Sequence, residues 1–184
     1  LHTVAYLLIG LISLVCTLIT PLRWWDLGLS LSFYPEWDKV LYHPWSLVTY
    51  ALPHLNFFHF FGNMCLVYAL LPVMAHRLGT RRFLWTYIGG IIAGALTYLL
   101  GYQLIGAKII PPLSLQGASA AILSVCAAAV MVDRKILSSF TLRFTGNSIP
   151  PIALWVFLFL VFLSAGRGNL GGHLAHLGGL LFGI

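Results

Sequence analysis

The chain has 184 residues, of which 60% are hydrophobic and only 8% are charged. Ordinary soluble domains carry about 45–50% apolar and about 25% charged residues, so this composition excludes a typical soluble enzyme and indicates a membrane protein. The formal net charge of +6 comes from basic residues between apolar runs. They form no stripe interleaved with aromatic rings, which argues against nucleic-acid binding.

Membrane-length apolar stretches organise the chain. A transmembrane helix needs about 20 mostly apolar residues, and six segments approach this length. They are Thr3–Thr20, Asn56–Ala75, Phe83–Leu104, Gln116–Val132, Ile149–Ala165 and a last one that starts near Gly172 and is cut off at Ile184. We therefore expect an all-α bundle of six membrane spans, with residues 1–184 forming one domain whose sixth span is truncated.

The longest connection, residues 21–53, is rich in aromatic side chains. They are Trp24, Trp25, Phe33, Tyr34, Trp37, Tyr42 and Trp45. Amphipathic rings of this kind favour the headgroup zone of a bilayer. We expect this connection to lie partly in the membrane interface, with short helices, and its aromatic rings to act as anchors.

Basic residues in the short connections predict the orientation in the membrane. The turns after the second and fourth spans hold Arg77, Arg81, Arg82, Arg134, Lys135 and Arg143 against the single acid Asp133. Because cytoplasmic loops carry the excess of Lys and Arg, we expect both chain ends in the cytoplasm. The Ser119 end of the fourth span then faces the outer side.

Small residues recur at spacings that let helices approach closely in lipid. Gly90 and Gly94 have this spacing in the third span, and Ala175, Gly179 and Gly183 have it in the sixth. The pattern predicts tight packing around the fourth and sixth spans.

Polar side chains inside apolar spans are costly unless paired, and they indicate a functional site. They are His54, His59 and Asn63 at the second span, Ser119 at the fourth, and His173 and His176 at the sixth. By the predicted topology, the His54, Ser119 and His173 ends of their spans lie toward the same membrane face.

This set suits acyl transfer, which needs a nucleophile, a base and donors aimed at an oxyanion. Ser119 and His176 supply the first two. His59 and Asn63 are four residues apart, share a helix face and carry donors. The Ser119 N–H near a helix start is a further donor. Since all four acids lie in connections, we predict a Ser–His dyad without a third acid.

The motifs His54-x4-His59-x3-Asn63, Gly117-x-Ser119 and Ala175-His176-x2-Gly179-x3-Gly183 together resemble the rhomboid intramembrane serine proteases. The resemblance covers nearly the whole chain. It implies that Ser119 is the nucleophile and His176 the general base. The oxyanion hole would comprise His59, Asn63, Gly117 and Ala118, and the secondary or structural residues would be His54, His173 and Gly179.

Three positions depart from the pattern that the resemblance implies. Ala120 follows the serine where many members have glycine. Ser46 follows Trp45 where an arginine is frequent, and Ala75 precedes His76-Arg77 where a glutamate is common. The last departure removes an expected structural hydrogen-bond network but leaves the catalytic pair.

The resemblance implies an enzyme of the bacterial inner membrane that cleaves transmembrane segments of other proteins, without metal or cofactor. Its partners would be such substrates and the lipid bilayer; the oligomeric state stays open. One alternative is an inactive relative that binds and escorts membrane proteins. Another is a small transporter that uses the intramembrane histidines as a proton path, although no internal repeat supports it.

Overall fold

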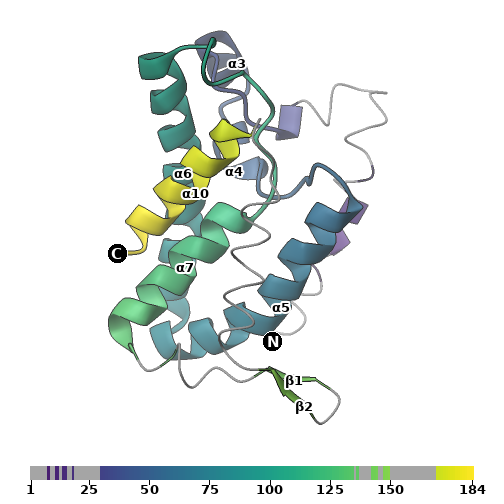
Figure 1. The fold of residues 1–184 in the computed structure, drawn as a ribbon, viewed down its shortest axis with the longest axis vertical. Coiled ribbons are helices and arrows are strands. Elements are labelled where there is room, and N and C mark those ends of the chain that lie inside the picture. The colour runs from purple at the N-terminus through teal and green to yellow at the C-terminus, as the bar shows by residue number, and fades with distance from the viewer. Residues whose placement is uncertain are drawn as a thin grey trace.

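The computed structural model describes residues 30–134 and 169–184, together with positions 8, 11, 12, 14, 15, 18, 136, 142–144 and 147–149. Over these residues the chain is mostly helical, and the helices pack along one another (Figure 1). Most of the predicted first span, Thr3–Thr20, and of the predicted fifth span, Ile149–Ala165, lies outside the described residues.

The described elements follow one another in this order: α3 (Trp37–Tyr42), α4 (Ser46–Thr49), α5 (Phe57–Leu78), α6 (Thr80–Ile105), α7 (Ser119–Val132), β1 (Leu142–Phe144), β2 (Asn147–Ile149) and α10 (Leu170–Phe182). Helices α3 and α4 are the short helices expected in the first connection. Strands β1 and β2 form an antiparallel hairpin with Leu142 opposite Ile149. This hairpin departs from the all-α prediction, and Ile149 pairs in it instead of opening a span.

Asparagine side chains cap two of the helices. The Asn56 side chain accepts the His59 N–H at 2.9 Å ahead of α5, and the Asn169 side chain accepts the Gly172 N–H at 3.0 Å ahead of α10. A cap of this kind satisfies one of the free N–H groups of the first turn. The second and sixth apolar segments therefore begin within two residues of their predicted starts.

The boundary between the second and third apolar segments differs from the prediction. Gly79, with a φ of 75°, is the single residue between α5 and α6. Its conformation in the left-handed region suits glycine, which has no Cβ. As a result, Arg81 and Arg82 lie in the first turn of α6 rather than in a connection.

The fourth apolar segment also begins later than predicted. Helix α7 starts at Ser119, whereas the sequence predicted a start at Gln116. Gly117 has a φ of 107° and donates its N–H to the Tyr50 carbonyl at 2.8 Å, so the chain there is a loop. With 14 residues, α7 rises only about 21 Å.

Two helices of the described part are long and apolar enough to cross a membrane. They are α5, with 22 residues, and α6, with 26 residues, while α7 is apolar but shorter. This fits the membrane class that the composition indicated.

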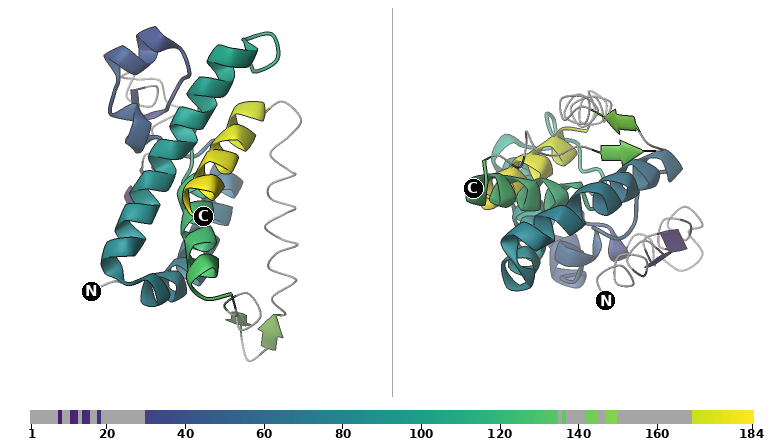
Figure 2. Two further views of the ribbon diagram at one scale, coloured as in Figure 1. Left: turned by 90° about the vertical axis from the view of Figure 1, so that its left-hand side faces the viewer. Right: turned by 90° about the horizontal axis from the view of Figure 1, so that it is seen from below.

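Apolar side chains, most of them large, fill the contact between α5 and α7. The residues of this core include Met64, Leu66, Val67, Leu70, Leu71, Ile122, Val125 and Ala129. Helix α10 lies against the other side of α7 and against α6 (Figure 2). Helix α7 is thus packed between α5 and α10.

The contacts of α10 depend on glycine, as the sequence predicted. A Cβ on Gly179 would overlap the backbone carbonyl of Ala120, and one on Gly183 would overlap that of Ser124. In α6, a Cβ on Gly94 would stand 2.9 Å from the Cβ of Ala120. The prediction of close packing around the fourth and sixth segments is confirmed.

The first connection is divided between surface and core. Trp37 is 54% exposed and Trp45 is 50% exposed, in accord with interfacial rings, but Phe33 is fully buried. Phe33 packs on the rings of Tyr50 and Tyr98, at centroid distances of 6.4 and 6.2 Å. The prediction that Phe33 is an interfacial anchor is therefore wrong, and Trp24 and Trp25 lie outside the described residues.

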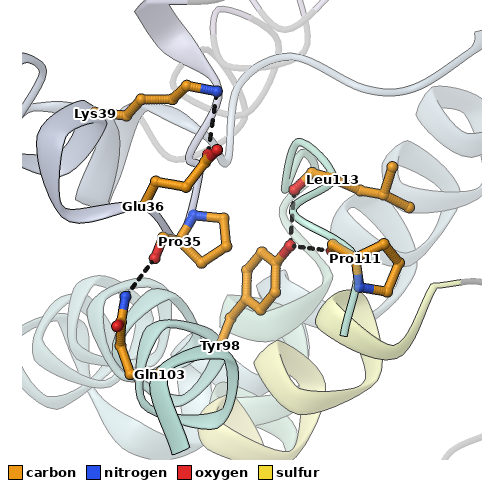
Figure 3. A network of polar contacts seen from close by, with 7 residues as sticks. All are labelled: Pro35, Glu36, Lys39, Tyr98, Gln103, Pro111 and Leu113. Carbon is orange, nitrogen blue, oxygen red and sulfur yellow. Dashed lines mark hydrogen bonds and ion pairs between the residues drawn. The ribbon is translucent and has the colours of Figure 1, made fainter. Parts of the chain in front are cut away.

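Hydrogen bonds fasten the connections at the end of α6. The single O–H of Tyr98 is shared between the carbonyls of Pro111 and Leu113, at 3.0 and 2.9 Å, and the Gln103 amide donates to the Pro35 carbonyl at 3.0 Å (Figure 3). The segment that returns from α6 to α7 is thereby held on the helix it leaves.

Candidate active site

The structure brings Ser119 and His176 together. Ser119 is the first residue of α7 and is partly exposed, and His176 lies on α10. The Ser119 Oγ lies 2.6 Å from the His176 Nε2, although the two residues are 57 positions apart in sequence. At this distance the imidazole is positioned to accept the hydroxyl proton, which is the geometry of an activated nucleophile.

The helix contact explains why so short a side chain reaches its partner. Gly179 is three residues after His176, and it rests on the carbonyl of Ala120, the residue after Ser119. Because glycine lets the two backbones touch here, the serine and histidine meet one turn away.

His59 of α5 lies beside the loop that precedes Ser119. Its Nδ1 accepts the Leu55 N–H at 3.4 Å, which places the ring proton on Nε2. That Nε2 lies 2.9 Å from the point where a Cβ on Gly117 would stand. His59 therefore has a donor facing the loop that leads into Ser119, and Gly117 makes room for it.

Asn63 lies one turn further along α5 and is 3% exposed. Its Nδ2 donates to the His59 carbonyl at 2.9 Å, and its Oδ1 accepts no hydrogen bond from the part of the chain that the structure describes. The sequence analysis predicted that Asn63 supplies a donor to the oxyanion. In the structure one amide hydrogen of Asn63 is donated to the His59 carbonyl, so only the second hydrogen is left for a ligand.

His54 is buried and packs against His59. It is 1% exposed, and its ring packs edge-on against His59 at 5.2 Å and against Phe60 at 5.6 Å. Burial, with a smaller contribution from charge on His59, lowers the pKa of His54 to about 3. His54 is thus a neutral packing residue in the folded protein.

His173 lies on α10 one turn before His176, with the two ring centroids 6.4 Å apart. Ala118 precedes Ser119 as the N-cap of α7; its side chain is buried, and its carbonyl accepts the Ile122 N–H at 3.1 Å. His173 and Ala118 therefore flank the Ser119–His176 pair.

Sequence reasoning missed the residues that hold the loop before Ser119. Phe33 and Leu115 exchange two backbone hydrogen bonds, of 3.2 and 2.8 Å, and the Tyr50 carbonyl accepts the Gly117 N–H. The Gln116 side chain donates to the Ser32 hydroxyl at 3.0 Å. These partners are more than 60 positions apart in the chain, so no local pattern could reveal them.

The structure describes the surroundings of the three positions that depart from the expected pattern. Ala120 is buried against Gly94 and Gly179. Although Ala75 replaces an acid, Arg77 pairs with Asp133 at 3.0 Å, which ties α5 to the end of α7.

Two side-chain hydrogen bonds hold the connection next to Ser46. The Trp45 indole donates to the Ser30 carbonyl at 2.9 Å, and the Thr49 hydroxyl donates to the Leu31 carbonyl at 2.9 Å. Within the described ranges, no group of three His, Cys, Asp or Glu residues is arranged to hold a metal ion.

Residues 42–184 match a family model described as Rhomboid domain. The match covers well over half of the chain and includes every predicted site residue. No curated protein matches the chain.

Proposed function

The chain belongs to the rhomboid family, and on that premise we propose that it is an intramembrane serine endopeptidase. Its substrates would be transmembrane segments of other membrane proteins. The observation that carries the proposal is the 2.6 Å contact between Ser119 Oγ and His176 Nε2. An inactive relative would have no need to keep a serine and a histidine in this contact.

The first half of the reaction forms an acyl-enzyme. Ser119 Oγ attacks the scissile carbonyl carbon while His176 Nε2 takes the hydroxyl proton. The tetrahedral intermediate then collapses, the C–N bond breaks, and His176 returns the proton to the leaving amine. The C-terminal fragment, which carries the new amino terminus, departs, and the N-terminal fragment stays attached to Ser119 through its carbonyl as an ester.

The second half repeats these steps with water. His176 takes a proton from the water, whose oxygen attacks the ester carbonyl, and then protonates Ser119 Oγ as the ester bond breaks. Ser119 is partly exposed, which supports access of water to the site.

The oxyanion would be held from two helices. The Ser119 N–H lies in the first turn of α7, where backbone donors are free of helix partners and the helix dipole favours negative charge. The His59 Nε2–H and the second amide hydrogen of Asn63 would complete the hole. Loss of one such donor costs about 10²–10³ in kcat.

The proposed setting is a six-span bundle with both termini in the cytoplasm of a bacterium and the site open to the outer face. A helical substrate hides its carbonyls in hydrogen bonds, so it must unwind at the cut. Substrates with small or helix-breaking residues there would be cut faster than an uninterrupted leucine helix.

A serine-directed fluorophosphonate tests the proposal on the purified protein in detergent, alongside cleavage of a model transmembrane substrate in liposomes. We expect wild type to be labelled and to cleave, and Ser119→Ala and His176→Ala to do neither. Ser124→Ala is the matched control, because Ser124 is a fully buried serine on the same helix.

Labelling of Ser119→Ala would show that another residue reacts with the probe, and Ser119 would then not be the nucleophile. A folded wild type that resists several such probes and cleaves no substrate would favour the membrane-protein-binding alternative. Histidine-dependent proton flux that survives Ser119→Ala would favour the transporter.

A further inference from the structure

Tyr50 connects the middle of α6 to the loop that precedes Ser119. Its hydroxyl donates to the Ile91 carbonyl of α6 at 2.8 Å, and its own backbone carbonyl accepts the Gly117 N–H at 2.8 Å. The side chain is 1% exposed. A single buried residue therefore joins a long helix to the position two residues before the proposed nucleophile.

Gly117 is the point in the loop where position matters most. Its φ of 107° is a conformation that suits glycine, and its Cα faces the His59 ring so closely that a Cβ would stand 2.8 Å from the ring. A small shift of Gly117 would therefore move the Ser119 N–H and the His59 Nε2 relative to each other.

The surroundings of Tyr50 are shaped to hold its hydroxyl. A Cβ on Gly94 would stand 2.8 Å from the Tyr50 hydroxyl oxygen, so the glycine leaves the room that the phenol occupies. On its other side the ring packs on Phe33, whose backbone pairs with Leu115 in the same loop. The Tyr50 side chain is therefore held both by its hydroxyl and by its ring contact with Phe33, and this also holds the Tyr50 backbone carbonyl in place.

We propose that Tyr50 is a positioning residue for the active site. The hydrogen bond from its hydroxyl to α6 holds the Tyr50 carbonyl in place. That carbonyl in turn fixes Gly117, and with it the relative positions of the Ser119 N–H and the His59 Nε2. The effect on the loop stands on geometry alone, while the effect on turnover rests on the proposed protease function.

The test compares Tyr50→Phe with Ser124→Ala. The first substitution removes only the hydroxyl and keeps the ring. The second removes another buried hydroxyl that donates to an α6 carbonyl, that of Thr86 at 3.0 Å. Both variants lose the same kind of bond to the same helix, but only Tyr50 also binds the loop.

The first readout is amide hydrogen exchange of the peptide that contains Gly117. Each variant is measured at the same number of degrees below its own Tm, so that differences in global stability do not affect the comparison. In Tyr50→Phe we expect exchange at Gly117 to be about tenfold faster, the effect of losing one buried hydrogen bond. In Ser124→Ala it should match wild type. Unchanged exchange in Tyr50→Phe overturns the proposal, whether or not the protein is a protease.

Turnover per fluorophosphonate-titrated site is the second readout. We expect kcat of Tyr50→Phe to fall about tenfold while KM changes by less than about twofold, because a misplaced oxyanion hole weakens the transition state more than the bound substrate. A purely structural role would lower the titrated fraction and leave kcat per site unchanged. 4-Aminophenylalanine at position 50, which restores a donor, should recover both exchange and kcat.

The two readouts separate the possible failures. If wild type neither labels nor cleaves, the protease function fails, but the exchange result still decides the role of Tyr50 in the loop. If wild type cleaves and Tyr50→Phe retains its full kcat, the positioning role in catalysis is wrong and the protease function stands.

Discussion

Helix α7 packs on α6, α10 and α5, and its contacts with α10 and with α5 differ in kind. Against α10 it presents small residues, and the backbones touch where Gly179 meets Ala120 and Gly183 meets Ser124. Against α5 it presents Ile122 and other bulky side chains that fill a thick apolar core. We call the α7–α10 contact the thin contact and the α7–α5 contact the thick contact. The proposed nucleophile and base face each other across the thin contact.

The difference follows from the reach of the side chains. A serine hydroxyl extends only a short way from its backbone, so a hydrogen bond between Ser119 and His176 requires the two helices to approach closely. The imidazole of His59 extends further, and α5 can stand behind bulky residues and still present a donor to the loop. The thin contact therefore sets the distance between Ser119 and His176, while the thick one mainly supplies stability.

The largest expected effect is at the thin contact. In Gly179→Ala the new Cβ would meet the Ala120 carbonyl, and the helices would have to separate. We expect kcat/KM to fall at least about 100-fold, since misplacement of reacting groups by about 1 Å has effects of this size. The assay is cleavage of a model transmembrane substrate.

Gly62→Ala is the matched control for that variant. Gly62 lies on α5 with nothing within 4 Å of where its Cβ would be, so activity should stay within about threefold of wild type. Equal losses in the two glycine variants would contradict the distinction between the contacts.

A second prediction removes the donor that α5 supplies while the thin contact is left intact. His59→Ala should lower kcat about 10²–10³-fold, the cost of one oxyanion donor, with Ser119 and His176 still in contact. Steady-state kinetics in liposomes measures this. Phe58→Ala, at an 83% exposed neighbour, is the control and should change kcat little; full activity of His59→Ala would exclude the residue from the hole.

A third prediction concerns the thick core. Leu70 is 2% exposed on α5, and Leu70→Ala should destabilise the protein by about 2–5 kcal/mol through the cavity that it leaves. Turnover per titrated active site should remain near wild type. Unfolding by denaturant in mixed micelles measures the first quantity and probe titration the second.

Leu100→Ala, at a 58% exposed position of α6, controls for the loss of side-chain volume. Should Leu70→Ala fold fully but lose turnover per site, the thick core would also set the catalytic geometry.

The smallest expected effect is at the far end of the α5–α7 contact. Arg77 and Asp133 form a half-exposed ion pair at 3.0 Å, and such pairs contribute about 0–1 kcal/mol. A double-mutant cycle with Arg77→Gln and Asp133→Asn should give a coupling in that range and unchanged kcat. A coupling of several kcal/mol would mean that the pair fixes the helices.

The apolar composition and the polar residues within it were enough to predict a helical membrane protein and to single out Ser119, His176, His59 and Asn63. The reason is physical: polar groups are costly in lipid, so the few that occur there stand out. Small-residue spacing likewise predicted the close approach of α10, because backbone contact is possible only where side chains are absent.

Tertiary structure alone decided how these residues are arranged. It placed the helix start at Ser119 rather than Gln116, buried Phe33, committed one hydrogen of Asn63 to the helix backbone and fastened Gly117 to Tyr50. Each of these depends on hydrogen bonds or packing that only the folded chain defines, several of them between residues far apart in the chain. Local sequence patterns carry no record of such partners, because backbone carbonyls and N–H groups are the same at nearly every residue.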